Sequence, residues 1–324
     1  MARKKFQFVA NLKEGDKVND IFAVKFKKPI REQYGMVFFE MRLWDKTGEI
    51  SAKVYSGNGG IKKLRELYGC FDKDDIIHIT GVVERKGDLI EIVMDENDMI
   101  RKVDEDEFDP SDFVDGLSEE EIKSLEKELL GFVDSVENKH LNELLNAFFR
   151  DDEFMKEFRV TPAAIMYHQN YKGGLLKHTV NVTKICDFAC NFYDVDRDLV
   201  ISGALLHDIG KIRELSVTSS ITFSDEGILL GHLIIGKEMV QAKIDSLNGF
   251  PEKMKYKLLH IIISHHGELI YGSPKKPCFP EAEMVYLADN MDATMEQICG
   301  IKNNAITEDS WFWSRRFNRH IYME

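Results

Sequence analysis

The chain has 324 residues, of which 44% are hydrophobic and 31% are charged. These fractions exclude a disordered or collagen-like chain, and the length favours two domains of about 150 residues each. No apolar run reaches the roughly 18 residues that cross a membrane, and the first residues lack the apolar core of a secretion signal, so we expect a soluble cytoplasmic protein with no membrane partner. Five scattered cysteines without a CxxC pair predict reduced thiols.

The charge is unevenly distributed along the chain. The net charge is −13, yet residues 1–65 contain 15 Lys or Arg against 7 Asp or Glu, whereas residues 101–160 contain 8 against 19. The net charge argues against a nucleic-acid partner. The distribution of charge matters more than its total, however, so the basic N-terminal segment is still compatible with such a partner.

Residues 16–95 predict five strands with one short helix. The strand segments are rich in β-branched and aromatic residues, and turn signals at residues 45–48 and 86–88 separate them. Residues 58–69, between the third and fourth strands, are helix-like. This order is typical of an OB-fold, a small barrel that often binds single-stranded nucleic acid or sugars, and we assign it to residues 1–100.

The second half of the chain predicts helices to its end. Residues 104–116 are acidic and contain Pro and Gly, which is typical of an exposed linker. Ser118 and Glu121 then form a capping-box pattern that starts a helix. We therefore predict a small all-β barrel followed by an all-α domain: an acidic linker with connecting helices at 101–160, the main helical domain at 161–302, and an aromatic tail at 303–324 that docks on the helical core or on another subunit.

The helical half contains seven candidate metal ligands: His178, His207, Asp208, His232, His265, His266 and Asp289. A single His on an apolar helix is more often a hydrogen-bonded core residue than a ligand. His207 and Asp208, however, end an otherwise apolar helix, where a divalent cation would compensate the cost of burying both groups. Because adjacent helical residues point about 100° apart, the pair would serve a site that lies between several helices.

These residues divide into two ligand sets. One set contains His178, His207, Asp208 and Asp289, and the other contains His232, His265 and His266, with Asp208 as a bridge between two ions. Imidazole and carboxylate without thiolate suit Mn²⁺, which we favour, and also Fe, Co²⁺ and Ni²⁺, while Zn²⁺ is not distinguished. We expect one or two divalent ions per chain.

The order of these residues resembles the H…HD…D pattern of the HD superfamily of metal-dependent phosphohydrolases. The segments GGLLKHT, LLHDIGKI, HHGEL, YGSPKKP and EAEMVYLADNMDA are similar to those of YhaM-type 3′-to-5′ exoribonucleases, in which an OB-fold precedes the HD domain. The resemblance covers nearly the whole chain, except residues 101–160 and the tail after 302. It implies hydrolysis of single-stranded RNA, with single-stranded DNA as a second substrate, from the 3′ end by a metal-activated water.

Asp208 and Lys211 are the candidate catalytic residues. Asp208 would hold both ions. Lys211 follows His207 by four residues, so on a helix it would lie on the same side and reach the extra negative charge of the transition state. The alternative is a lysine that compensates the dipole at a helix C-terminus. Asp292, one turn after Asp289, is a candidate for orienting a ligand imidazole.

Basic and aromatic side chains of the N-terminal half are candidates for nucleic-acid contacts. The basic ones would follow the phosphates or form ordinary solvated surface: Lys25, Lys27, Lys28, Lys62, Lys63 and Arg65. Of the aromatic ones, one or two would stack on bases and the rest would fill the barrel: Phe22, Phe26, Tyr34, Phe38, Trp44 and Tyr55.

Two other functions remain open at this point. An HD phosphohydrolase acting on a nucleotide or cyclic dinucleotide would use the OB-fold as a sensor, although Gly267-Glu268-Leu269 stands where enzymes of cyclic dinucleotides have a GYP element. An OB-fold binding module with a degenerate HD domain is the non-enzyme alternative, and the intact ligand set argues against it. A homo-oligomer is left open.

Overall fold

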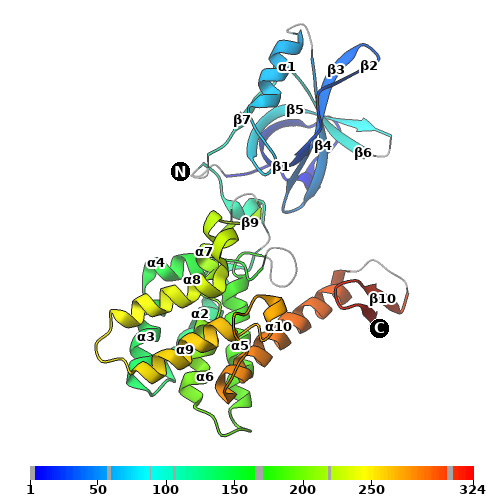
Figure 1. The fold of residues 1–324 in the computed structure, drawn as a ribbon. Helices are drawn as coiled ribbons and strands as arrows, with labels where there is room; N and C mark the ends of the chain where they lie inside the picture. Colours follow the sequence, from blue (N-terminus) through cyan, green and yellow to red (C-terminus); the bar gives the residue numbers. More distant parts are fainter. Residues whose placement is uncertain are drawn as a thin grey trace. The chain divides into compact units, whose positions relative to one another are not determined.

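The computed structural model describes residues 4–56, 60–87, 89–104, 107–114, 116–164, 171–217, 220–304 and 309–324. The chain divides into two compact units (Figure 1). The barrel unit comprises Met1–Asp115 with Val217–Ile221, and the helical unit comprises Gly116–Ser216 with Thr222–Glu324. The domain boundaries predicted at residues 100, 160 and 302 stay predictions.

Five strands of the barrel unit form a closed barrel. They are β1 (Lys17–Lys27), β3 (Met36–Asp45), β4 (Gly48–Tyr55), β5 (Ile76–Lys86) and β6 (Leu89–Asp95). They pair in the order β1-β3-β4-β6-β5, and β5 pairs with β1 to close the circle. Only the β4–β6 pair is parallel among these barrel pairings. Helix α1 (Gly60–Gly69) lies between β4 and β5 in the sequence. This connectivity is that of an OB-fold, which confirms the prediction.

Shorter elements complete this unit: the 3₁₀ turn η1 (Val9–Asn11), β2 (Arg31–Gln33), which pairs with β3, and β7 (Ile100–Lys102), which pairs with β5. The barrel interior takes the alternate side chains of the strands. Of the six aromatic candidates, Phe22 and Phe38 are buried, Trp44 and Tyr55 are half-buried, and Phe26 and Tyr34 are exposed.

The segment predicted as an exposed linker is partly buried, so that prediction is wrong for its apolar residues. Phe108 and Phe113 are 5% and 1% exposed, and they pack edge to face at 5.7 Å between ring centroids. Both belong to a cluster with Ile21, Ala23 and Ile76 of the barrel strands. The 3₁₀ turn η3 (Pro110–Asp112) lies between the two rings in the sequence. Burial of apolar surface therefore outweighs the acidic composition of this segment.

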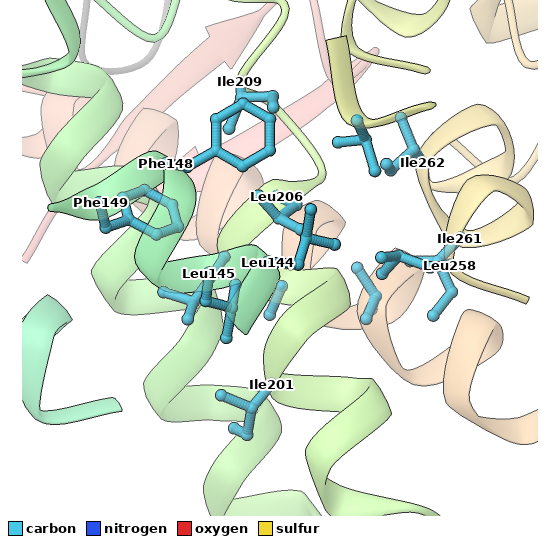
Figure 2. Packing of buried hydrophobic residues seen from close by; sticks show 14 of the residues in the cluster. Leu144, Leu145, Phe148, Phe149, Ile201, Leu206, Ile209, Leu258, Ile261 and Ile262 are labelled. Atoms are coloured by element: carbon cyan, nitrogen blue, oxygen red, sulfur yellow. The ribbon is translucent and has the colours of Figure 1, made fainter. Parts of the chain in front are cut away.

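The helical unit contains α2 (Glu119–Asp134), α3 (Lys139–Phe149), α4 (Asp152–Phe158), α5 (Gly174–Ala189), α6 (Arg197–Leu206), α7 (Lys211–Glu214), α8 (Asp225–Asp245), α9 (Glu252–Ser264), the 3₁₀ turn η4 (Leu269–Tyr271) and α10 (Pro280–Asn304). The predicted capping box is present, because Ser118 and Glu121 exchange hydrogen bonds at the start of α2. Every residue from Leu199 to Leu206 in α6 is buried. Side chains of α3, α6 and α9 pack together in one core (Figure 2), and this core fixes the end of α6.

Two hairpins interrupt the helices, so the prediction of helices to the end of the chain is wrong at these places. One joins β8 (Leu215–Val217) to β9 (Ile221–Phe223), and the other joins β10 (Trp311–Ser314) to β11 (Arg319–Tyr322). Alternating apolar residues explain the first hairpin, and the high strand propensity of aromatic residues explains the second. Trp311 and Trp313 are 58% and 47% exposed. No helix within the described residues has the length and apolarity for crossing a membrane, and all five cysteines are free.

Candidate metal centre

Several helices meet at the candidate site, and each contributes a predicted ligand. His178 lies in α5, His207 and Asp208 in the turn after α6, His232 in α8, His265 and His266 directly after α9, and Asp289 in α10. The buried core around α6 fixes the turn that holds His207 and Asp208, which are 0% and 1% exposed.

Two features of the backbone bring His232 into the site: a kink in α8 and a close approach of the turn after α6. Gly231 has φ +73°, and the helix α8 kinks there. A Cβ atom added to Gly210 would lie 2.1 Å from the carbonyl oxygen of His232, so only a glycine permits this approach. The turn after α6 therefore contacts the backbone of α8 directly.

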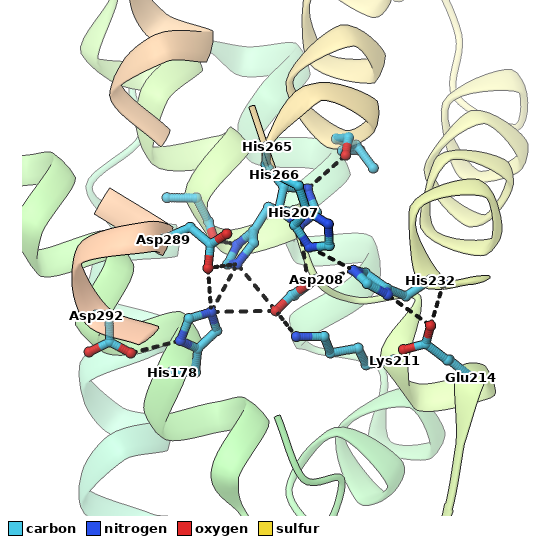
Figure 3. Close-up of polar contacts among 12 residues, drawn as sticks. His178, His207, Asp208, Lys211, Glu214, His232, His265, His266, Asp289 and Asp292 are labelled. Carbon is cyan, nitrogen blue, oxygen red and sulfur yellow. Dashed lines mark hydrogen bonds and ion pairs between the residues drawn. The ribbon is translucent and has the colours of Figure 1, made fainter. Parts of the chain in front are cut away.

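The structure brings the seven predicted ligands together in two groups (Figure 3). Ligand atoms of His178, His207 and Asp208 lie within 4.8 Å of one another, and so do those of His232, His265 and His266. Asp289 joins the first group, since its Oδ1 lies 3.1 Å from Nε2 of His178. These groups have the membership of the two predicted ligand sets.

Asp208 lies between the two groups. Its Oδ2 is 3.4 Å from Nε2 of both His178 and His207. Its Oδ1 is 3.5 Å from Nε2 of His232 and 3.4 Å from Nε2 of His265. Each carboxylate oxygen thus faces a different group, which is the geometry of a bridging ligand.

Each of the five imidazoles is oriented through its Nδ1 atom. The acceptors are Asp292 Oδ2 for His178 (2.7 Å), the Ala204 carbonyl for His207 (2.7 Å), Glu214 Oε1 for His232 (2.9 Å), the Ile262 carbonyl for His265 (2.7 Å) and the Tyr271 carbonyl for His266 (2.9 Å). These acceptors place a proton on Nδ1 and leave Nε2 directed toward the centre of the site. The predicted orienting contact of Asp292 with a ligand imidazole is confirmed.

The donor atoms at the centre fit a divalent cation. Oδ1 of Asp208 and Nε2 of His265 are buried without a hydrogen-bond partner among the described residues. Nε2 of His232 lies 3.2 Å from Nε2 of His266, and because both rings donate from Nδ1, two lone pairs face each other. Such an arrangement is unfavourable by itself, and a cation between these atoms removes the cost. HD domains bind divalent metals, and this donor set fits one.

The protonation states differ between the imidazoles of the site. Burial and the neighbouring His266 lower the pKa of His265 to about 3. Burial alone would raise the pKa of Asp208, but Lys211 and His207 hold it well below its ordinary value. Burial would lower the pKa of His178, yet hydrogen bonds to Asp289 and Asp292 raise it to about 9. The site therefore holds a proton on His178 that a cation would displace.

Lys211 is the first residue of the four-residue helix α7. Its Nζ is 2.6 Å from Oδ2 of Asp208, and its side chain is 10% exposed. Burial alone would lower the pKa of Lys211, but Asp208 raises it, so the amine stays protonated. The contact of Lys211 with the negative charge of the transition state stays a prediction.

Glu214 was not identified from the sequence. Its Oε1 accepts hydrogen bonds from both Nδ1 and the backbone N–H of His232, each at 2.9 Å. Burial would raise the pKa of Glu214, but the hydrogen bonds from His232 lower it. Its only sequence signal is an acidic residue six positions after Asp208, in a segment that also forms the short helix α7.

A cavity of about 700 Å³ opens beside the metal centre within the helical unit. Its described lining includes Lys211, Glu214, His232, His266 and Asp289 from the site, together with residues of α10 and of the C-terminal hairpin. The site is therefore buried on its ligand side and accessible from the cavity.

The six basic candidates belong to the barrel unit, whereas the metal centre belongs to the helical unit. Lys25 pairs with Glu49, and Lys28 pairs with Glu40 at 2.9 Å. Lys27 is 13% exposed, and its amine bonds to the carbonyls of Tyr68 and Phe71 and pairs with Asp72. The geometry does not support Lys27 as a phosphate contact. The other three lie exposed on α1: Lys62, Lys63 and Arg65.

Residues 175–294 match the HD domain family, a span that contains all seven predicted ligands. The crystal structure of the p204 HINb domain aligns with 32% of this chain and 47% of its own, at 15% identity and a TM-score of 0.24. A structure of a replication protein A heterotrimer bound to single-stranded DNA aligns with 37% of this chain and 29% of its own, at 16% identity and a TM-score of 0.25. This chain spans less than half of either structure, and the identification of the OB-fold rests on the strand order.

The class that the helical unit defines is that of metal-dependent phosphohydrolases, because the HD domain is a family of such enzymes. Its site combines a bridging carboxylate, oriented imidazoles and an adjoining cavity. The chain thus combines an OB-fold barrel with an HD domain.

Proposed function

We propose that this protein is a YhaM-type 3′-to-5′ exoribonuclease that hydrolyses phosphodiester bonds of single-stranded RNA, with single-stranded DNA as a second substrate. The position of Asp208 between two imidazole groups carries the proposal, because two-ion sites are suited to phosphodiester hydrolysis. The OB-fold in the same chain supports a nucleic-acid substrate. The 3′ polarity is supported by the family resemblance of the HD segments.

The ligands fall into two proposed sites. His178, His207, Asp208 and Asp289 would hold one ion, and His232, His265 and His266 would hold a second with Asp208 shared. Bound divalent ions stabilise charge on the phosphate and lower the pKa of water, and Mn²⁺ is the favoured ion.

The chain's own side chains have separate tasks. Asp292 and Glu214 hold the rings of His178 and His232 in place. The Lys211 ammonium is held by Asp208 and lines the cavity, where it would bind a non-bridging oxygen of the phosphate and stabilise the negative charge that develops there. Asp208 and Lys211 are therefore the proposed catalytic residues.

The test compares substrates and end labels. Protein reconstituted with Mn²⁺ is incubated with RNA labelled at the 5′ or at the 3′ end. We expect the 5′-labelled RNA to shorten progressively and the 3′ label to appear at once as a mononucleotide. Release of the 5′ label first would contradict the polarity. Hydrolysis of a cyclic dinucleotide or a nucleoside triphosphate, with intact RNA, would instead support the nucleotide phosphohydrolase, and no hydrolysis of any substrate would support the binding module.

A further inference from the structure

We infer that the C-terminal hairpin forms a second phosphate-binding position of the active site. Arg316 contacts the phosphate next to the one that is cleaved, and Phe317 packs against the neighbouring sugar or base. This inference rests on the proposed function, because it assigns a role in binding the same single-stranded nucleic acid.

The first observation is that the hairpin and the metal centre share one cavity. Arg316 and Phe317 line the same space of about 700 Å³ as Lys211, His232 and Asp289. A volume of this size is at the upper part of the range for small-molecule sites, so it accommodates more than a single phosphate group. The substrate therefore extends beyond the metal centre inside the cavity.

The second observation concerns the wall that α10 provides. Asn290, Thr294 and Gln297 line the cavity on the same helix as Asp289. Their spacing of four and three residues places them on one face, and the eight residues from Asp289 to Gln297 rise about 12 Å along the helix. The cavity thus follows α10 for about two turns and offers hydrogen-bonding side chains along this path.

The third observation is the charge of the lining. Among the described lining residues, Lys211 and Arg316 carry the positively charged Lys and Arg side chains. A guanidinium group binds phosphate through two parallel hydrogen bonds. Arg316 therefore supplies the cavity with a phosphate-binding group that is separate from the ligand cluster.

The hairpin is built to present this loop. Strand pairing of Ser314 with Arg319 closes a loop of residues 315–318, and Asn318 adopts a left-handed backbone conformation with φ +48°. The Arg319 guanidinium lies 5.4 Å from the ring centroid of Phe317. Lys302 in the last turn of α10 donates a hydrogen bond of 2.8 Å to the carbonyl oxygen of Glu324, which ties the end of β11 to the helix.

Arg315 provides a matched control. It lies in the same loop, is exposed, and is absent from the cavity lining. Arg316→Gln and Arg315→Gln remove the same charge from neighbouring positions. Two substrates separate the roles: bis(p-nitrophenyl) phosphate, which has a single phosphate, and a labelled single-stranded RNA of ten nucleotides.

We expect Arg316→Gln to raise KM for the RNA about tenfold, the effect of removing one charged hydrogen bond, with kcat unchanged. The log–log salt slope of RNA binding should fall by about 0.7, which is the contribution of one phosphate on a single strand. Hydrolysis of bis(p-nitrophenyl) phosphate should not change. Arg315→Gln should match the parent with both substrates. Equal KM values for RNA in the two variants would overturn the inference.

A modified RNA identifies the phosphate. A neutral methylphosphonate replaces the linkage next to the 3′-terminal one. We expect it to raise KM of the parent by the same factor as Arg316→Gln does, and to add nothing further in that variant. If the methylphosphonate raises KM of Arg316→Gln by the same factor as it raises KM of the parent, Arg316 does not contact this phosphate. That result would overturn the inference.

Two further measurements keep the outcome clear. The emission of Trp311 and Trp313 reports on the hairpin, and Arg316→Lys should restore the salt slope if charge is what the position supplies. A lysine variant with the slope of Arg316→Gln would count against the inference. If the parent hydrolyses neither substrate, the proposed function fails and this inference fails with it. If the parent hydrolyses both and the two Gln variants behave alike, only the inference fails.

Discussion

The two units of this protein differ in where most of their charged groups lie. In the barrel, basic side chains pair with a few acidic ones: Glu40 lies 2.9 Å from Lys28 and 2.8 Å from Arg31, which are exposed, and 3.3 Å from Lys53, which is buried. In the helical unit, His178, His207 and Asp208 are buried together and surround one centre.

This difference bears on what each unit can do. Exposed ion pairs are worth about 0–1 kcal/mol, so a phosphate can replace a glutamate as the partner of a barrel lysine at little cost. A buried cluster cannot exchange partners in this way, since an unpaired buried charge is strongly destabilising. The barrel therefore suits adaptable, salt-sensitive binding, and the helical unit suits a fixed site.

The largest expected effect is on the buried cluster. Asp208→Ala should reduce RNA hydrolysis at least about a thousandfold and remove both ions, because this carboxylate faces both groups of imidazoles. Elemental analysis and end-labelled RNA measure the two effects. Asp245→Ala, at an exposed carboxylate of α8, serves as the control. Activity of Asp208→Ala within tenfold of the parent would remove Asp208 from the site.

A smaller effect is expected from the residues that orient the imidazoles. Glu214→Gln should weaken binding of the second ion about 10- to 100-fold, because Glu214 fixes Nδ1 of His232. Asp292→Asn should do the same for the first ion through His178. Isothermal titration calorimetry with the metal ion distinguishes the two variants. If both variants weaken the binding of the same ion equally, the site holds a single ion rather than two.

The barrel should respond more mildly. The triple change of Lys62, Lys63 and Arg65 to Gln should raise KM for RNA severalfold and lower the log–log salt slope by about 0.7 for each phosphate that the variant no longer binds. Lys25→Gln, whose partner Glu49 already compensates its charge, should have a smaller effect. Fluorescence anisotropy over a salt series gives the slopes. An unchanged slope in the triple variant would exclude α1 from the binding surface.

The smallest effect concerns the stability of the barrel. Burial alone would raise the pKa of Glu40, but Lys28 and Lys53 beside it lower this pKa to about 2. The folded state thus binds fewer protons than the unfolded state between pH 4.5 and 2. The stabilisation is complete above pH 4.5 and is lost as the pH falls through 2. Glu40→Gln should lower Tm at pH 7 by a few degrees, and the difference should shrink in that window. A constant difference would contradict this pKa.

Much of this arrangement is predictable from the sequence. The strand order and the ligand sets depend on local patterns, namely β-rich segments between turns and a His-Asp pair at the end of an apolar helix, and both patterns are visible in the residues. The position of Asp292 follows from helix spacing. In each case the signal lies within a few residues of the feature it predicts.

The remainder depends on contacts between distant segments. Glu214 reaches His232 because α8 kinks at Gly231 and returns toward α7. Lys27 is held by the carbonyls of Tyr68 and Phe71, more than forty positions away. Neither contact follows from a periodic pattern or a residue spacing in the sequence. For this reason the sequence suggested an exposed position for Lys27 and gave no role to Glu214.

Gly210 contacts the backbone of His232, so the proposed second ion would depend on a residue that has no ligand atom. A methyl group at position 210 would lie 2.1 Å from the His232 carbonyl oxygen and 2.6 Å from the Gly236 nitrogen, which is a severe steric clash. The turn after α6 and helix α8 would then have to move apart, which would separate His232 from His207 and Asp208. In the proposed two-ion site, the second ion would therefore depend on the absence of a side chain at position 210.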